Sequence, residues 1–289
     1  MARSVVAACV GAALCAALAA GQETRTFDLR TTYPYRAGDR VRVVTGSKHE
    51  GLANVLHRGK PVRVENKRGG YELRYVDEVQ ALHPGGGVVR VQRTYERVKD
   101  WATGQEERRP RRVLLDYSGE HMRFTAQDEV PEAARELLES ASKVPLSAFQ
   151  HLLPPAPIVA LGQRWTIPNA PAAQIFRLDP AAVVEAGSAC SGRVDATRQR
   201  QGAEQVCLVF EFRLAFTRLY DITFDPPAEL EVRFDMWEST DGAAPADSGT
   251  IRGTIKGTGR VPDAPKEITV QLQVTVTGTY QRELLSTAR

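Results

Sequence analysis

Hydrophobic and polar residues alternate along much of this chain, the pattern of β-strands with one buried face. The clearest run is 268–277, in which Ile, Val and Leu alternate with Thr and Gln for ten residues. Similar runs occupy 206–216 and 229–236, and shorter strands are expected at 40–44, 61–64, 71–79, 88–98, 113–117 and 122–126. Turn residues separate them at Gly69-Gly70, 84–87 and Ser118-Gly119. Consecutive strands joined by short turns pair antiparallel, and the polar positions indicate one solvated face.

Residues 128–153 interrupt this pattern with apolar residues at helical spacing. Asp128 can cap a helix that Pro131 opens, Pro145 starts a second piece, and Pro154-Pro155 ends it. An isolated apolar helix face must be buried, and the apolar face of a sheet is the available surface. The prediction is therefore a mainly β fold: a large curved antiparallel sheet, half-barrel-like, with one helical segment packed on its concave face.

The first twenty residues have the features of a Sec signal peptide. Arg3 precedes a small apolar run from Val5 to Leu18, and small residues follow before the polar stretch that begins at Gln22. Lipoprotein anchoring is not expected, because Cys9 follows too short an apolar stretch and Cys15 follows a leucine where a small residue is needed. We expect periplasmic or secreted localisation.

The mature chain is expected to form one β-rich domain. No later segment approaches 18 apolar residues, so no transmembrane segment is expected after cleavage. The predicted organisation is a signal peptide at 1–20 and a single domain at 21–289. A weak echo between 34–41 and 157–165 offers two related halves, about 30–155 and 156–289, as an elaboration.

Short motifs at the start of each half resemble a family of uncharacterised secreted bacterial β-rich proteins. The motif residues here are Tyr33, Tyr35, Gly38 and Asp39, then Pro155, Pro157, Val159, Gly162 and Trp165. Gln163 departs from the acidic residue usual in that family. The resemblance implies a large periplasmic β-rich fold and assigns no activity. By architecture alone, the predicted fold is also similar to the half-barrel carriers of lipoproteins and lipids in the bacterial envelope.

Cysteine and histidine positions bear on disulfide and metal chemistry. Removal of the leader leaves Cys190 and Cys207 in an oxidising compartment, on either side of a polar, turn-like segment. We predict a Cys190–Cys207 disulfide, with two buried free thiols as the alternative. No metal site is expected, since the five histidines are scattered: His49, His57, His83, His121 and His151.

Catalytic motifs are incomplete. His49-Glu50 begins an H-E-x-x-H string, but Ala53 stands where the second histidine belongs. Ser140 and Lys143 match S-x-x-K, yet the companion S-D-N and K-T-G motifs of penicillin-binding enzymes are missing from the sequence. The sequence therefore predicts a non-enzymatic protein without a cofactor, and no catalytic residue is assigned.

Basic and acidic residues are nearly balanced along the chain. The formal charge of +3, from 38 basic and 35 acidic residues, does not suggest nucleic-acid binding. An arginine cluster at 108–112 can meet anions or be a solvated loop balanced by Glu106 and Glu107. The preferred function is binding of an apolar ligand or an envelope protein in the concave sheet. The alternatives are a structural or interaction module with a filled core and an unrecognised hydrolase.

Overall fold

The computed structural model describes residues 25–287 apart from 30–34, 85–87, 109–110, 120–121, most of 131–151, 157, 177, 201–202, 241–246 and 263. The predicted signal peptide lies outside the described residues. The predicted helical segment does so largely too, although Arg135, Leu138 and Glu139 within it are helical.

The described chain is dominated by β-strands. In chain order these are β1 (Thr26–Asp28), β2 (Arg40–His57), β3 (Lys60–Leu82), β4 (Val88–Asp100), β5 (Glu106–Glu107), β6 (Arg111–Asp116), β7 (Arg123–Ala126), β8 (Ile158–Ala160), β9 (Arg164–Thr166), β10 (Val183–Arg200), β11 (Ala203–Leu219), β12 (Ile222–Ser239), β13 (Ser248–Arg260) and β14 (Ile268–Ser286). A short helix α3 (Asn169–Ile175) and a 3₁₀ turn η2 (Pro180–Ala182) precede β10.

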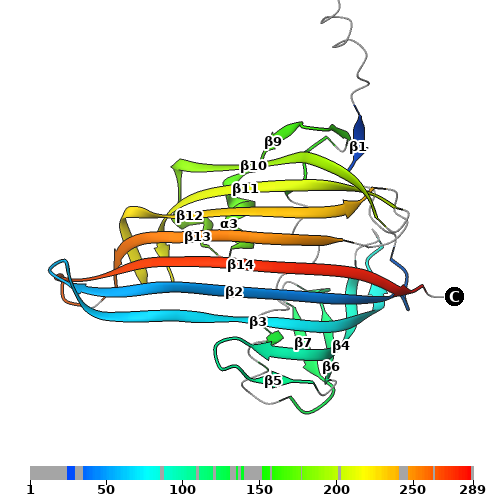
Figure 1. Cartoon of the computed structure of the whole chain (residues 1–289), viewed down its shortest axis with the longest axis horizontal. Helices are drawn as coiled ribbons and strands as arrows, with labels where there is room; N and C mark the ends of the chain where they lie inside the picture. Colours follow the sequence, from blue (N-terminus) through cyan, green and yellow to red (C-terminus); the bar gives the residue numbers. More distant parts are fainter. Residues whose placement is uncertain are drawn as a thin grey trace, which may run out of the picture.

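One antiparallel sheet of twelve strands organises the molecule (Figure 1). Its order is β7-β6-β4-β3-β2-β14-β13-β12-β11-β10-β9, with β5 added beside β4. Two meanders run outward from the centre, where the last strand, β14, pairs along its length with β2. β1 and β8 form a separate two-stranded sheet. The predicted mainly β fold, with a large curved antiparallel sheet, is confirmed.

The strands are longer than the sequence pattern predicts. The expected turn at Gly69-Gly70 is wrong, because β3 runs without a break from Lys60 to Leu82. A Cβ atom on Gly70 would lie 2.0 Å from the carbonyl oxygen of Ser47, and the φ of Gly70 is +126°. These glycines therefore serve close approach of two strands rather than chain reversal.

Two hydrophobic clusters occupy the same, concave face of the sheet, one toward each end of the strand order. The first is built on β10, β11 and β12, and the second on β2, β3, β4 and β6. Helix α3 packs on the first through Ala172 and Ala173, and the ring of Phe176 meets Phe212 edge-on at 5.1 Å. Leu138 is fully buried in the second. A helix on the concave face was predicted, but α3 itself was not.

The two stretches that carry the sequence echo, 34–41 and 157–165, contain the same turn. In the first, the Gly38 N–H donates to the carbonyl of Val79, and the Val79 N–H donates to the carbonyl of Asp39. In the second, Gly162 and Gln163 exchange the equivalent hydrogen bonds with Val194. Both glycines have positive φ, 92° and 80°. The next side chain accepts a backbone N–H three residues earlier in each case, at 2.8 Å for Asp39 and 2.9 Å for Gln163. Gln163 thus supplies the oxygen acceptor that an acidic residue would supply.

Candidate functional site

The central strands leave a band of aliphatic side chains on the concave face between the two clusters. On β12, next to this band, every concave-face side chain from Leu230 to Met236 is buried. Two strands further on, β14, which is described over its whole length, has no fully buried residue. We call this band the concave strip; its half-buried members are Ile251, Ile255, Val270, Leu272, Val274 and Val276.

Glycines beside the concave strip make its surface smooth. On β13, Gly253 and Gly257 stand opposite Val276 and Leu272. On β2, Gly51 stands opposite Val274. A Cβ on Gly51 would lie 2.9 Å from Cγ2 of Val274, so the valine leans into the space that the glycine leaves. The strip is therefore a continuous apolar surface rather than a row of separate side chains.

The elements that cover the concave face reach mainly the first cluster. Helix α3 contacts β10 and β11, and η2 contacts β11. Trp165 closes the edge near β10: its indole lies over Gly192, and its Nε1–H donates to the carbonyl of Leu152 at 2.7 Å. These contacts fill one end of the concave face with the chain's own residues. Ile251, Ile255 and Leu272 of the strip pack against this cluster, and the strip continues along β14 with Val270, Val274 and Val276.

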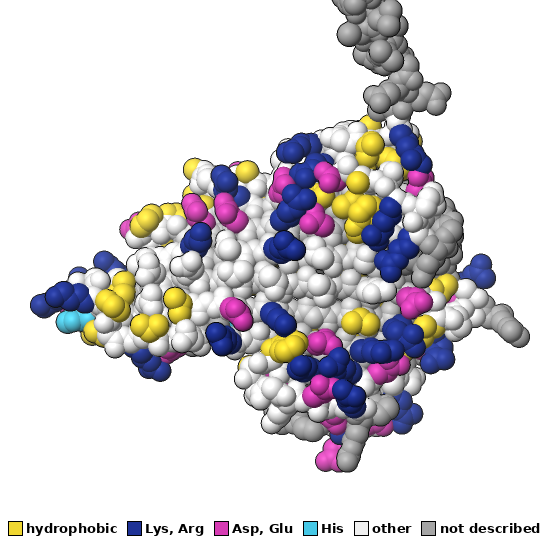
Figure 2. Space-filling view, viewed as in Figure 1, with side chains coloured by type: hydrophobic (Ala, Val, Ile, Leu, Met, Phe, Trp, Pro, Cys, Tyr) yellow, Lys and Arg dark blue, Asp and Glu magenta, His cyan; other side chains and the backbone are white. Residues whose placement is uncertain are grey.

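The opposite face of the sheet is polar and carries a shallow trough of about 1120 Å³. Side chains in matching register on β11, β12 and β13 line its middle, namely Glu211, Arg213, Glu231, Arg233, Arg252 and Thr254. Arg213 pairs with Glu231 at 3.3 Å, and Arg233 pairs with Glu211 at 3.5 Å. Figure 2 shows this face, with basic and acidic side chains interspersed. Such paired charges describe a solvated surface without a concentrated charge of either sign.

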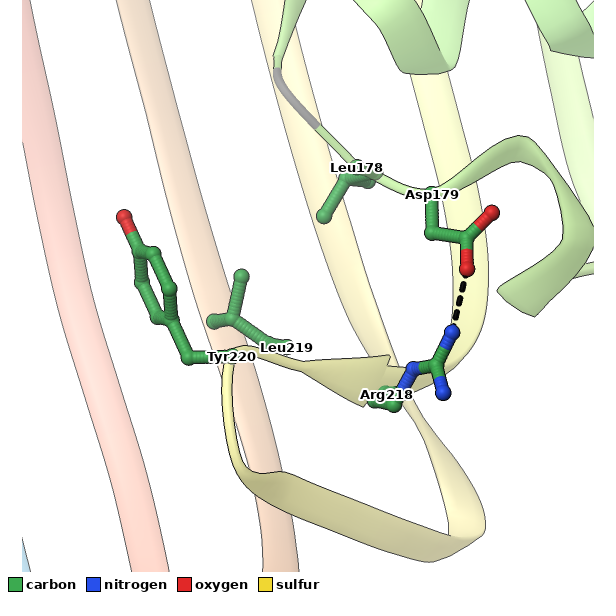
Figure 3. A pocket seen from close by; sticks show the side chains of 5 residues that line it. All are labelled: Leu178, Asp179, Arg218, Leu219 and Tyr220. Carbon is green, nitrogen blue, oxygen red and sulfur yellow. Dashed lines mark hydrogen bonds and ion pairs between the residues drawn. The ribbon is translucent and has the colours of Figure 1, made fainter.

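A smaller hollow of about 220 Å³ lies at the turn between β11 and β12 (Figure 3). An ion pair between Arg218 and Asp179 forms one side, and Tyr220 lies at the other. A hydrogen bond from the Ala181 N–H, helped by Arg218, lowers the pKa of the Asp179 carboxyl. Since this acid is held ionised and paired, it is unsuited to proton transfer near neutral pH.

One buried carboxyl has a pKa near neutrality. Burial, reinforced by the charge of Asp247, raises the pKa of Glu238 to about 7, against the opposing effect of Arg282. Asp247 itself forms an ion pair with Arg282. The same surroundings raise the pKa of Tyr280, chiefly through burial. These four residues form a charge cluster, and none of them lines either hollow described above.

The catalytic candidates in the sequence form no site among the described residues. His49 lies exposed on a strand, with its ring over Gly69, so the H-E-x-x-H geometry on a helix does not arise. Ser140 and Lys143 lie outside the described residues. No group of three metal-ligating side chains occurs among the residues that the structure describes.

The arginine cluster is balanced by acids, and two of the tryptophans lie against cations. Arg108, Arg111 and Arg112 pair with Glu106, Glu107 and Asp128. Trp101 lies against the ammonium groups of Lys48 and Lys99, and Trp237 lies under Arg198. Because each of these charges is engaged within the chain, none of them marks a ligand.

The predicted disulfide is wrong: Cys190 and Cys207 are buried free thiols. Cys190 lies opposite Phe212 and Cys207 lies opposite Ala196, so the two are offset by five residues along β11. Five residues of strand correspond to about 17 Å. An odd offset also directs the side chains to opposite faces, and a disulfide needs Cα atoms within about 7 Å. Burial raises the pKa of both thiols to about 11.

In the part of the chain that the structure describes, no helix is long and apolar enough to cross a membrane.

Comparisons with known proteins place the chain in no family. No protein-family model matches the sequence, and no curated protein matches it either.

Proposed function

We propose that this protein binds an apolar ligand of the acyl-chain class on the concave strip. It acts outside the cytoplasm and catalyses no reaction. The observation that carries the proposal is the change in burial across the sheet. β12 is covered on its concave face, whereas the aliphatic side chains of β14 are only half-buried. A contiguous apolar surface of this kind marks a binding site more often than an isolated exposed aliphatic residue does.

The length of the strip suits a hydrocarbon chain. Val270 to Val276 covers seven residues of extended strand, whose six steps span roughly 20 Å. The hydrocarbon half-thickness of a bilayer is roughly 15 Å, so an acyl chain can lie along the strip. Each methylene removed from water contributes roughly 0.8 kcal/mol, which gives useful affinity even with partial burial.

Alternation on β14 supplies a matched test. Val274 faces the strip, and Thr275, the next residue, faces the polar side of the sheet. We expect delipidated protein to bind the fluorescent apolar probe N-phenyl-1-naphthylamine, and Val274→Glu to weaken binding at least tenfold. Thr275→Glu adds the same charge on the other face and leaves probe binding unchanged. Equal effects of the two variants, or no probe binding by folded wild-type protein, contradict the proposal.

The filled ends of the concave face favour a second candidate, a protein-interaction module. Both hydrophobic clusters are packed by the chain's own residues, including Leu152 in the first and Leu138 in the second. Native mass spectrometry of protein purified from its host, before and after organic extraction, separates the two functions. A mass excess removed by extraction supports ligand binding, whereas a bare polypeptide mass favours the interaction module.

A further inference from the structure

The hairpin that joins β2 to β3 lies, with the start of β14 beside it, at one end of the sheet (Figure 1). Its turn is two residues long, Arg58-Gly59, and both have positive φ, 48° and 77°. This backbone matches the twist of the flanking strands and makes a tight, firmly placed tip. The Arg58 N–H donates to the carbonyl of Glu267 at 2.9 Å, which ties the tip to the start of β14. We call residues 52–65 the hairpin tip.

Large aliphatic side chains are exposed at the hairpin tip. Val62 is 62% exposed, Val64 is 56% exposed and Leu52 is 39% exposed. Val64 pairs with Asn54, so Val64 and Leu52 lie on the same face as close diagonal neighbours. Val62 adjoins them at a register shift of the hairpin. The three form one apolar patch on the hairpin tip.

Basic side chains lie beside this patch, at the turn of the hairpin and at the start of β14. Arg58, Lys60 and Lys266 are exposed, and among the described residues none of the three has an ion-pair partner. Arg63 also lies here and pairs with Glu65 at 2.8 Å. Apart from Glu65 and Glu267, the charged side chains described in 52–65 and 264–268 are basic. Figure 2 shows basic, histidine and hydrophobic side chains gathered at the pointed end of the molecule.

Protection of a sheet edge accounts for only part of this composition. β4 pairs with β3 from Tyr71 onward, so the first part of β3 forms an edge of the sheet. Proline and basic residues on an edge discourage pairing with other chains, and Pro61 and Arg63 fit that role. Exposed valines have the opposite effect, because they make an edge more prone to association. The valines therefore need another explanation.

From this patch we infer a membrane-docking surface: the hairpin tip inserts Val62 and Val64 between the headgroups of an anionic bilayer while Arg58 and Lys60 contact the lipid phosphates. Aliphatic side chains with basic ones beside them match the two layers of a bilayer surface, apolar chains beneath negative headgroups. Because the turn is tight and tied to β14, little conformational freedom is lost on docking. This inference is independent of ligand binding on the concave strip.

Vesicle flotation with purified protein tests the inference. Phosphatidylcholine vesicles with and without phosphatidylglycerol are compared at low and high salt, and any contribution of the apolar N-terminal segment is common to all variants. We expect binding to need phosphatidylglycerol and to fall at high salt. Loss of two basic contacts in Arg58→Gln/Lys60→Gln is expected to weaken partitioning roughly 30-fold. Arg40→Gln, at the other end of β2, serves as the charge control.

The apolar part of the inference has its own pair of variants. Val62→Asp/Val64→Asp is expected to abolish flotation, and the milder Val62→Thr/Val64→Thr to reduce it. Ile158→Asp is the control, since Ile158 is 59% exposed on β8, away from the hairpin tip. Circular dichroism verifies that each variant is folded. The inference is overturned if folded wild-type protein does not bind anionic vesicles, which would favour an acidic protein as the partner of the tip. It is also overturned if the tip variants and the controls bind vesicles equally.

Discussion

The buried ion pair between Arg93 and Asp77 gives the sharpest stability prediction. Arg93 on β4 and Asp77 on β3 stand directly opposite each other and are only 6% and 7% exposed. The guanidinium donates from Nε at 2.7 Å and from Nη2 at 2.8 Å to the two carboxylate oxygens. Its carbon also lies 3.8 Å from the centre of the Tyr75 ring. The pair is thus bidentate and enclosed by the second hydrophobic cluster.

Asp77→Asn keeps the side-chain volume but leaves a buried guanidinium without a counter-charge. Breaking a buried pair in this way costs about 3–5 kcal/mol, because the remaining charge stays desolvated. For a domain of this size each kcal/mol corresponds to about 2–4 °C in Tm, so a fall of roughly 6–20 °C is expected. Urea unfolding followed by tryptophan fluorescence gives the free energy directly.

Two further variants show whether the cost comes from the unpaired charge. Asp77→Leu/Arg93→Met removes both charges, and we expect much of the lost stability to return. Glu231→Gln breaks the exposed pair with Arg213 on the polar face and is expected to cost at most about 1 kcal/mol. If Asp77→Asn costs no more than Glu231→Gln, the pair is not desolvated in the way its burial indicates, and the reasoning fails.

Three other predictions follow from single sites. The pKa of Glu238 is raised to about 7 in the folded protein, so this carboxyl is protonated more readily there than in the unfolded chain, and its contribution to stability is lost as pH rises from about 4.5 through 7. Glu238→Gln should therefore raise Tm above that of the wild type at pH 8 and change it little at pH 5. The same difference between variant and wild type at both pH values would contradict this. Gly192→Val should displace the indole of Trp165, shift its fluorescence and cost about 1–3 kcal/mol, whereas an unshifted spectrum would show that the ring is elsewhere. Iodoacetamide should modify Cys190 and Cys207 fully in urea without reductant but slowly in the native protein, and a bridged fraction by mass spectrometry would refute the register.

Strand positions were predictable because their signal is local. The alternation at 268–277 has a period of two, which only a strand with one buried face explains, and β14 occupies that segment. Strand lengths were harder to predict. Gly69-Gly70 has the composition of a turn, yet it permits close approach to β2, a contact between residues distant in sequence.

Cross-strand pairing shows what spacing alone leaves out. β10 ends at Arg200, which pairs with Ala203, so residues at equal distances from this turn face each other. Cys190 lies ten residues before Arg200, whereas Cys207 lies only four after Ala203. The polar turn lies where the sequence predicts it, but the two cysteines are at unequal distances from it, so they do not face each other and the predicted disulfide is wrong. The sequence predicts an apolar concave face, but neither which part of that face stays half-buried nor the exposure of the hairpin tip, since the exposure of an aliphatic residue depends on which elements fold over it.

The concave strip and the hairpin tip are connected by the pairing of β14 with β2. Val270, at one end of the strip, stands opposite Val55, and two residues further Ile268 stands opposite His57 at the tip. A tip seated in lipid headgroups would therefore bring the open end of the strip to the bilayer surface, where an apolar chain could pass between the two without crossing water. If so, Val62→Asp/Val64→Asp should slow transfer of a fluorescent acyl lipid from vesicles while leaving equilibrium binding of N-phenyl-1-naphthylamine intact. Val274→Glu should reduce both. Identical losses in the two variants would mean that the tip acts through the fold of the strip rather than through the membrane.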